Sequence, residues 1–385
     1  MPRYNSVFLQ LPTYPQQILE RKKAEVLQKG ITLYDFGVGD PREAVPDFIP
    51  KALKEAVSGH FGYPSIVGDP LFRQTVADYV KRRFGVELDP ERQILPCSGS
   101  KEAVFHAPLL VIDPKAPDRT VLFPDPGYPA YCRGALFAGG EAIPVPLTGD
   151  FVFRPWELSE EILKKTRLLW LNTPHNPSGA VTSLSDLKRI AALCRKYDIL
   201  CISDECYADV YTDDPPHSML ECGFENILVF HSLSKRSGMT GYRSAFIAGD
   251  PEIIEQYRRL RTNFGVAPQS FVNAAAVAAW SDDSHASARR EIFREKKRLF
   301  IDFFTEQGWE FTGADASLYL WLKTPEGQSP VEMSEELLSV GVVVSPGCYY
   351  ALTDAGDQHI RLAMVPDLES CKEAIAQWAA LLEKK

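Results

Sequence analysis

Through the middle of this chain, short apolar runs rich in strand-forming residues alternate with segments of helical periodicity. The predicted strands cover residues 119–123, 141–145, 167–171, 198–203 and 227–231. Between them, residues 101–110 and 184–195 repeat apolar side chains at helical spacing, and Thr182 and Ser183 are suitable caps for the second helix. Strands that alternate with helices form a mainly parallel sheet with helices on both faces. We therefore predict an α/β fold.

The pattern changes after about residue 250. Residues 243–249 follow the preceding strand after too short a connection for a crossover helix, so they are expected to run antiparallel to it. Helical stretches follow at 251–261 and 269–307, with a break near Ser281, and then short strands around 317–322 and 359–364 and a closing helix from Leu368. The sequence thus predicts a large domain of residues 47–280 and a smaller α+β domain of residues 1–46 and 281–385.

Composition narrows the possible functions. The chain has 385 residues, of which 45% are hydrophobic, and its formal net charge is −9. This acidic balance argues against a nucleic-acid partner. The N-terminal residues 1–6 lack the uninterrupted apolar core of a signal peptide, and no apolar run approaches the length of a membrane span, so we expect no membrane association and a cytoplasmic location. The 8 cysteines form no CxxC pair or Cys/His cluster, so no metal is expected.

One segment, residues 232–243 (Ser-Leu-Ser-Lys-Arg-Ser-Gly-Met-Thr-Gly-Tyr-Arg), carries the clearest chemistry. Lys235 follows an apolar strand, where partial desolvation disfavours the ammonium and favours a nucleophilic amine that can form a Schiff base. Ser232, Ser234 and Arg243 offer hydroxyl and guanidinium groups to a phosphate. A surface turn with no function is the alternative interpretation of this segment taken alone.

Two further motifs lie where open α/β sheets bind ligands. Residues 97–102 form a turn of small residues that opens a helix, where the backbone N–H groups of Ser100 and Lys101 can bind phosphate. Residues 172–179 (Asn-Thr-Pro-His-Asn-Pro-Ser-Gly) follow a strand, and their two prolines favour a rigid loop that aims Asn176 into a cleft. A simple turn is the alternative for this loop.

An acid and two aromatic residues are the remaining candidate residues for a ligand site. Asp204 follows the strand 198–203, and a carboxylate there can hold a proton on a pyridine nitrogen. Tyr207 offers its phenol to a ring oxygen. Tyr128 can stack on an aromatic ring. The alternative interpretations are that Asp204 caps a helix, that Tyr207 is a phenol of the core, and that Tyr128 is an aromatic residue in a turn.

These motifs, Asn-Pro-x-Gly, Asp-x-x-Tyr and Ser-x-Ser-Lys with an arginine eight positions later, resemble the class I/II aminotransferases, which depend on pyridoxal 5′-phosphate (PLP) and have fold type I. The resemblance covers essentially the whole chain. It implies that Lys235 forms the covalent bond to PLP and acts as the catalytic base. Asp204 then pairs with the ring nitrogen, and Asn176 and Tyr207 contact the ring oxygen. Tyr128 stacks on the ring, and the phosphate ligands are Ser100, Lys101, Ser232, Ser234 and Arg243.

The resemblance also implies a substrate site and a partner. Arg361 would bind the substrate α-carboxylate, with Gly39 and Asn176 nearby. The family is dimeric, so a homodimer is expected, and Tyr63 would reach the phosphate of the neighbouring subunit. The reaction moves an amino group between an amino acid, with glutamate as the expected donor, and a 2-oxo acid.

The lysine segment looks most like that of the N-succinyldiaminopimelate aminotransferases of lysine biosynthesis, whose oxo-acid substrate is N-succinyl-2-amino-6-oxopimelate. Related enzymes for LL-diaminopimelate, aspartate and alanine share much of it, and a PLP-dependent lyase on the same scaffold is a further alternative.

Other classes of protein fit the sequence less well. A serine hydrolase with the Ser232-x-x-Lys235 motif and a kinase with Asp35-Phe-Gly37 both lack their partner motifs, and a PLP-binding regulator would need an additional module.

Overall fold

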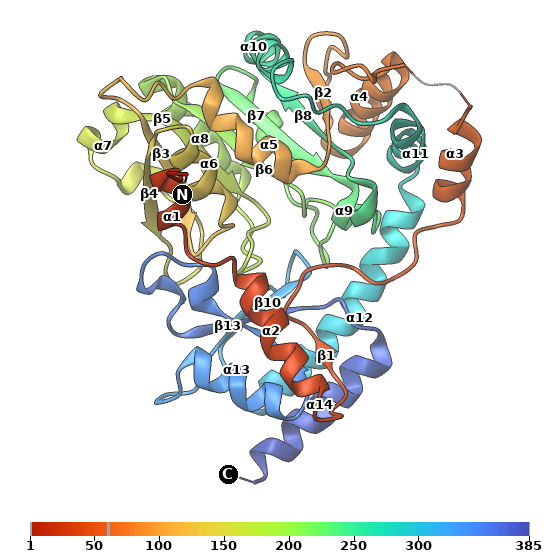
Figure 1. The fold of residues 1–385 in the computed structure, drawn as a ribbon, viewed down its shortest axis with the longest axis vertical. Coiled ribbons are helices and arrows are strands. Elements are labelled where there is room, and N and C mark those ends of the chain that lie inside the picture. The colour runs from red at the N-terminus through yellow and green to blue at the C-terminus, as the bar shows by residue number, and fades with distance from the viewer. Residues whose placement is uncertain (1, 60–61, 385) are drawn as a thin grey trace.

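The computed structural model describes residues 2–59 and 62–384. In Figure 1 the chain forms a larger upper body around a seven-stranded sheet and a smaller lower body. The long helix α12 (Ser284–Glu306) runs from the upper body into the lower one. Within the described ranges, no helix has the length and apolar character needed to cross a membrane.

The large sheet has the strand order β2-β8-β7-β6-β5-β3-β4. Its strands are β2 (Ile94–Cys97), β3 (Thr120–Asp125), β4 (Glu141–Pro146), β5 (Thr166–Asn172), β6 (Leu200–Asp204), β7 (Ile227–Ser232) and β8 (Ala245–Gly249). Neighbouring strands from β7 to β4 are parallel, whereas β8 is antiparallel to both β7 and β2. The mainly parallel sheet and the reversed direction of residues 243–249 are thus confirmed.

Helices cover both faces of this sheet, as predicted, because successive strand residues point to opposite sides. On one face Val121 and Trp170 pack against α5 (Ser100–His106), α6 (Ala130–Phe137) and α10 (Pro251–Arg261). On the other face Leu122 and Leu169 pack against α4 (Pro70–Phe84), α8 (Leu184–Tyr197) and α11 (Ser270–Ser281). Each face therefore has its own buried core.

Prolines account for two differences from the sequence prediction. Strand β2 was not predicted: it has only four residues, and Pro96 removes a backbone donor that a strand normally offers. The helix predicted over 101–110 is wrong in its second half, where α5 ends at His106 and residues Ala107–Leu110 form a 3₁₀ turn. Pro108 lacks the N–H group that would continue the α-helix.

The lower body contains a sheet of order β12-β13-β10-β9 and a parallel pair of β1 with β11. These strands are β1 (Tyr34–Asp35), β9 (Phe311–Thr312), β10 (Tyr319–Lys323), β11 (Val342–Val343), β12 (Ser345–Pro346) and β13 (His359–Ala363). Its core joins Phe300 of α12, Leu320 of β10 and Trp378 of α14 (Leu368–Leu382). Helix α13 (Pro330–Ser339) covers the other side of this body, beside α2 (Pro15–Leu27), whose Leu19 packs against Leu338.

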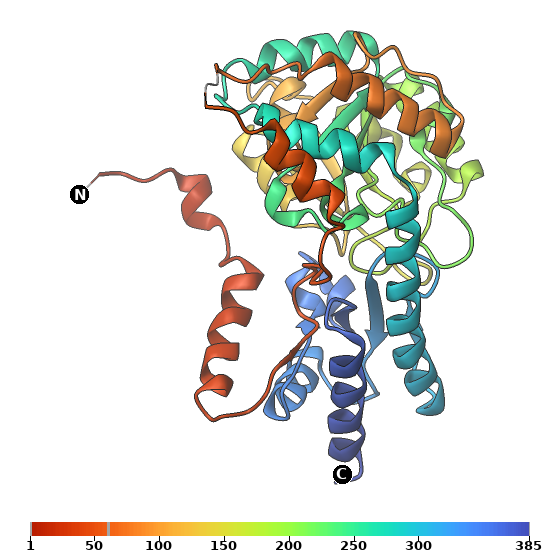
Figure 2. The same ribbon diagram turned by 90° about the vertical axis from the view of Figure 1, so that its right-hand side faces the viewer.

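The N-terminal helix α1 (Ser6–Gln10) projects away from both bodies (Figure 2), and Phe8 and Leu9 on it are exposed. The remaining helices are α3 (Phe48–Ala56), α7 (Glu160–Lys165) and the single turn α9 (Leu233–Arg236). Residues 31–43 return to the lower body through β1, whereas α3 lies on the upper body (Figure 1). The domain boundaries at residues 46 and 280 stay our proposal.

Candidate active site

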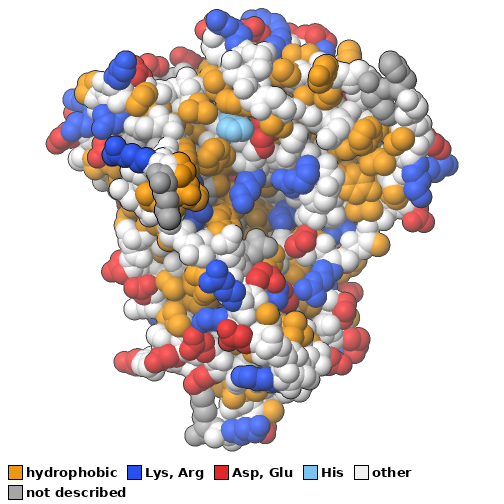
Figure 3. Space-filling view, in the orientation of Figure 1, with side chains coloured by type: hydrophobic (Ala, Val, Ile, Leu, Met, Phe, Trp, Pro, Cys, Tyr) orange, Lys and Arg blue, Asp and Glu red, His pale blue; other side chains and the backbone are white. Residues whose placement is uncertain are grey.

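A cavity of about 510 Å³ lies at the carboxyl ends of the parallel strands. Strands β5, β6 and β7 end at Asn172, Asp204 and Ser232, all of which line it. Figure 3 shows Lys and Arg side chains gathered around a hollow between the upper and lower bodies. The predicted site residues that line the cavity are Gly39, Ser100, Lys101, Tyr128, Asn176, Asp204, Tyr207, Ser232, Ser234, Lys235, Arg243 and Arg361.

Tyr63 is the predicted residue that the structure does not bring into this cavity. Its side chain is fully exposed to solvent. Its role toward a neighbouring subunit therefore stays a prediction.

Lys235 is placed by the junction of β7 and α9. Strand β7 is buried along its whole length, and Ser232 caps the helix: its Oγ accepts a hydrogen bond from Ser234 N at 3.1 Å. The half-buried side chain of Lys235 then enters the cavity, where Nζ donates to the carbonyl oxygen of Gly39. The amine of the upper body therefore contacts the loop that follows β1.

Asp204 lies buried at the end of β6. Its Oδ2 accepts from Tyr131 Oη at 2.9 Å, and its Oδ1 accepts from Cys206 N at 3.3 Å. Burial raises the pKa of this carboxyl, and the two hydrogen bonds partly oppose that effect. Tyr131 is itself fixed, because its ring stacks on Trp170 with centroids 4.8 Å apart.

Arg361, on β13, enters the cavity from the lower body. Its Nη1 donates to Asn176 Oδ1 at 2.9 Å and its Nη2 donates to Gly37 O at 2.8 Å. The guanidinium carbon lies 4.2 Å from the ring centroid of Tyr319 and 4.3 Å from that of Tyr350. The two rings hold the guanidinium plane between them, which favours one orientation of its donors.

Asn172 links two of the predicted residues. Its Oδ1 accepts from Asn176 N at 2.8 Å, and its Nδ2 donates to Asp204 O at 2.8 Å. Tyr207 is anchored separately, through a hydrogen bond of 2.9 Å between its hydroxyl and that of Tyr319. The ends of β5 and β6 are thus tied together beneath the cavity.

A second part of the cavity is suited to an anion. Gly99 has φ +81°, and a Cβ atom there would lie 2.2 Å from Arg243 Nη2, so only glycine lets the guanidinium approach this turn. Ser232 Oγ and Ser234 Oγ lie 3.0 Å apart on the neighbouring turn. Together with the first N–H groups of α5, these side chains form a set of donors around one end of the cavity.

Lys101 lies at the mouth of the cavity rather than deep within it. Its exposed side chain places Nζ 3.2 Å from Tyr14 Oη and 4.5 Å from the centre of that ring. Tyr14 precedes α2 and lines the cavity as well. The backbone of Lys101 is therefore near the anion donors, while its ammonium faces the entrance.

Sequence reasoning missed four residues that shape the site: Tyr131, Asn172, Tyr319 and Tyr350. Tyr131 and Asn172 lie within motifs at predicted strand ends, so the rule that strand ends bind ligands could have found them. Tyr319 and Tyr350 come from the lower body, and no local pattern relates them to residues more than a hundred positions earlier.

The chain matches the family model "Aminotransferase class I and II" over residues 31–377. An LL-diaminopimelate aminotransferase of Aquifex aeolicus is 34% identical over 373 residues, which cover 94% of this chain and 95% of that protein. A crystal structure of an aminotransferase from Neisseria meningitidis has a TM-score of 0.90 and 32% identity, and the match covers 98% of this chain and 100% of that one.

A probable N-succinyldiaminopimelate aminotransferase of Thermus thermophilus is similar too, with a TM-score of 0.88 and 26% identity over 98% of this chain and 100% of that one. The match to the family model covers most of the chain, and the relatives agree in fold over nearly their full lengths. The resemblance seen in the motifs is thereby confirmed: this chain belongs to the class I and II aminotransferases, PLP-dependent enzymes with fold type I.

Proposed function

We propose that this aminotransferase exchanges amino groups between diaminopimelate and 2-oxoglutarate, with glutamate as the partner amino acid, in lysine biosynthesis. The observation that carries the proposal is the convergence of Lys235, Asp204 and Arg361 on one cavity. An amine, a buried carboxylate and a clamped guanidinium are the three groups that transamination requires. The relative from Aquifex aeolicus, named for LL-diaminopimelate, supports the choice of substrate.

The residues present fit PLP. Donors for the phosphate come from Ser232, Ser234 and Arg243, beside the turn at Gly99. The buried Asp204 offers a carboxylate for the ring nitrogen. Tyr128 supplies an aromatic face, while Asn176 and Tyr207 offer donors for the ring oxygen. When bound, PLP supplies an aldehyde for covalent attachment and a ring that accepts electrons.

Lys235 and Asp204 divide the proton chemistry. Lys235 Nζ would hold the cofactor covalently, and the same amine, when free, would take the α-proton of the substrate and return it. The carboxylate of Asp204 would hold a proton on the ring nitrogen. The phenol of Tyr131 fixes the Oδ2 atom of Asp204, so this charge is oriented before the substrate binds.

Arg361 binds the α-carboxylate of either substrate. Its Nε is buried and has no hydrogen-bond partner among the described residues, although Nη1 and Nη2 have theirs. A carboxylate that pairs with the guanidinium would therefore satisfy a donor that the protein leaves open.

The distal end of the substrate explains our choice of diaminopimelate itself. This molecule carries a second ammonium and a second carboxylate, and the cavity lining includes both an exposed acid, Asp40, and an exposed base, Lys101. The succinylated compound would present a neutral amide and only negative charge there. A lining with both signs of charge fits the free amino acid better.

The same proposal includes a cytoplasmic homodimer. In it, Tyr63 of one subunit contacts the phosphate in the neighbouring subunit, which explains a tyrosine that is fully exposed in the single chain. Exposed Phe8 and Leu9 of the projecting helix α1 would be covered in the same assembly. Sedimentation of the purified protein tests the homodimer, since a fully active monomer at micromolar concentration would exclude it.

The test of the substrate is a panel of amino donors with 2-oxoglutarate as acceptor. LL-diaminopimelate, its N-succinyl derivative, aspartate and alanine are compared at equal concentration, and glutamate formation is measured. We expect the highest kcat/KM with free diaminopimelate. A higher value with the succinylated donor would reassign the substrate, and elimination products without glutamate would favour a lyase.

A further inference from the structure

Helix α9 carries two basic side chains that point in different directions. Lys235 and Arg236 are consecutive, so they are separated by about 100° around the helix axis. With four residues, α9 is one turn, which is too short to be stable without tertiary contacts. The orientation of Lys235 therefore depends on what holds the other side of α9.

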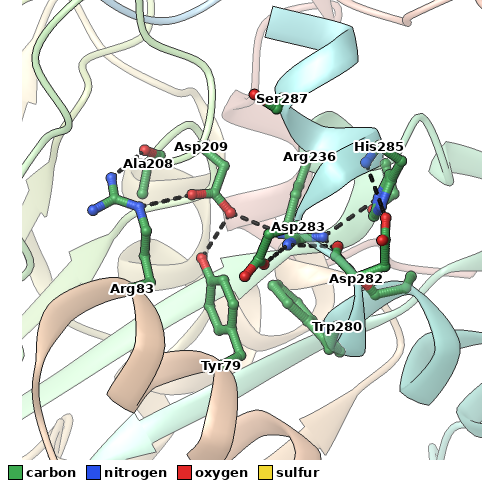
Figure 4. Close-up of polar contacts among 12 residues, drawn as sticks. Tyr79, Arg83, Ala208, Asp209, Arg236, Trp280, Asp282, Asp283, His285 and Ser287 are labelled. Carbon is green, nitrogen blue, oxygen red and sulfur yellow. Dashed lines mark hydrogen bonds and ion pairs between the residues drawn. The ribbon is translucent and has the colours of Figure 1, made fainter.

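Arg236 provides that hold. Its side chain is 3% exposed, and Nε lies 2.7 Å from Asp209 Oδ2. Nη1 donates to Ala279 O at 2.8 Å, and Nη2 donates to Asp282 O at 3.1 Å and to Asp283 Oδ1 at 2.5 Å. Figure 4 shows the guanidinium between Asp209 on one side and the segment that joins α11 to α12 on the other.

Asp209 is held from three directions. Besides Arg236, its Oδ1 accepts from Arg83 Nε at 2.9 Å and its Oδ2 accepts from Tyr79 Oη at 2.9 Å (Figure 4). Burial alone would raise the pKa of this carboxyl, but the charges of Arg236 and Arg83 and the bond from Tyr79 lower it to about 2. Asp209 is therefore ionised at neutral pH.

The position of Asp209 in the chain relates these ion pairs and hydrogen bonds to the cavity. Asp209 lies on the segment that leaves β6, two residues after Tyr207 and five after Asp204. Val210 N donates to Tyr207 O at 2.8 Å, which makes this segment a tight turn. One carboxylate thus connects the segment that bears Asp204 and Tyr207 to the helix turn that bears Lys235.

We propose that the Asp209–Arg236 ion pair is a positioning device that holds Lys235 Nζ in register with Asp204 and Tyr207. The inference rests on the proposed role of Lys235 in proton transfer. Neither Asp209 nor Arg236 lines the cavity, so both act through their neighbours in the chain. A buried ion pair is often no more stabilising than apolar residues of similar size, so stability alone does not explain it.

The experiment compares Arg236→Met with Arg195→Met. Arg195, on α8, also holds a carbonyl (Cys222 O, 2.5 Å) and a carboxylate (Glu225, 3.5 Å), and neither partner lines the cavity. We expect Arg236→Met to lower kcat by about 10²-fold, since a displacement of about 1 Å of a catalytic group has that effect. The KM values and the affinity for PLP should change by less than about threefold, because the ligands of substrate and phosphate are elsewhere.

A second readout uses the protein without cofactor. Acetic anhydride labels lysines, and mass spectrometry gives the labelling rate of Lys235 relative to the exposed Lys51 and Lys115. In Arg236→Met this ratio should change from its wild-type value, whereas in Arg195→Met it should not. Arg236→Lys should fall between, since an ammonium retains the pairing with Asp209 but cannot also reach Ala279 and Asp282.

The outcomes separate the inference from the function on which it rests. If Arg236→Met keeps wild-type kcat and labelling while Lys235→Ala is inactive, the inference alone is wrong. If Lys235→Ala remains active, the proposed function is wrong. A drop in kcat with unchanged labelling, or an equal drop in Arg195→Met, would also overturn the positioning role. Should Arg236→Met not fold, Arg236→Lys and Asp209→Asn are compared with wild type by the same two measurements.

Discussion

Lys235 and Arg236 are neighbours in one helical turn, yet their surroundings are opposite. On the cavity side, the amine of Lys235 is half-buried and donates to a single backbone carbonyl, that of Gly39. On the other side, the guanidinium of Arg236 is fully buried and meets two carboxylates and two carbonyls. The two basic residues therefore differ in function: the amine of Lys235 is available to a ligand, whereas the guanidinium of Arg236 is committed to contacts within the protein.

The fold thus keeps the side chains that can bind a ligand apart from those that support the site. A buried charge that is fully paired has no capacity left for a ligand, and removing one partner leaves the other unpaired at high cost. A charge at the edge of a cavity costs less to leave partly unpaired, and it can exchange a protein partner for a substrate. We therefore expect substitutions on the cavity side to affect turnover, and substitutions in the buried network to affect stability as well.

Among the cavity residues that form no covalent bond to the cofactor, Asp204 should have the largest effect on turnover when it is substituted. We expect Asp204→Ala to lower kcat by about 10²–10³-fold, the usual loss when one preorganised electrostatic partner of a transition state is removed. Asp204→Asn keeps an acceptor for Tyr131 but loses the charge, so it should be impaired to a similar extent. Steady-state kinetics and PLP titration give the result. Near-normal turnover with bound PLP in either variant would show that the ring nitrogen has no need of this charge.

Arg361 should have a smaller effect that falls on both substrates. Arg361→Ala removes a charge-assisted pair of about 1.5–3 kcal/mol, which corresponds to a loss of roughly 10- to 100-fold in kcat/KM. Arg361→Lys should lose less, because it keeps the charge but not the two-pronged geometry. KM should rise for the amino acid and for the oxo acid alike. A defect restricted to one of them would mean that Arg361 binds a distal carboxylate.

The sequence was sufficient for the parts of the site that depend on local order. Asp204, Asn176 and Lys235 each follow an apolar run, so the carboxyl ends of parallel strands bring them to one edge. The arrangement of Arg361 between two rings was not predictable in this way. Tyr319 and Tyr350 reach it through the packing of the lower body, and neither belongs to a short motif.

The buried network was also beyond the reach of sequence reasoning. Asp209 and Arg236 are polar residues next to functional motifs, and nothing in the local pattern distinguishes them from solvent-exposed charges. Their pairing depends on α4 and the end of α11, which contribute Tyr79, Arg83 and Ala279. Contacts between distant segments decide such clusters.

A further effect that we expect concerns acid stability. Asp209 has a pKa of about 2 in the folded chain, against an ordinary value of 3.8, because Arg236, Arg83 and Tyr79 outweigh its burial. A lowered pKa stabilises the fold above the ordinary value and loses that effect as the pH falls toward 2. A pKa of about 2 against 3.8 corresponds to roughly 2.5 kcal/mol.

The comparison of wild type with Asp209→Asn isolates this contribution. The difference in unfolding free energy, measured by urea denaturation, should be constant above about pH 5 and should shrink as the pH falls from about 4 to 2. A difference that stays constant down to pH 2 would mean that Asp209 is not held as an ion. A difference that grows toward acid would contradict the sign.

The most direct test of the proposed function is to find where the cofactor is attached. The wild-type protein is loaded with PLP, reduced with borohydride and digested, and the modified lysine is located by mass spectrometry. The role assigned to Lys235 predicts the label at that residue, and it predicts that Lys235→Ala shows neither the label nor transamination. A label on another lysine of the wild-type protein, or activity retained by Lys235→Ala, would contradict it.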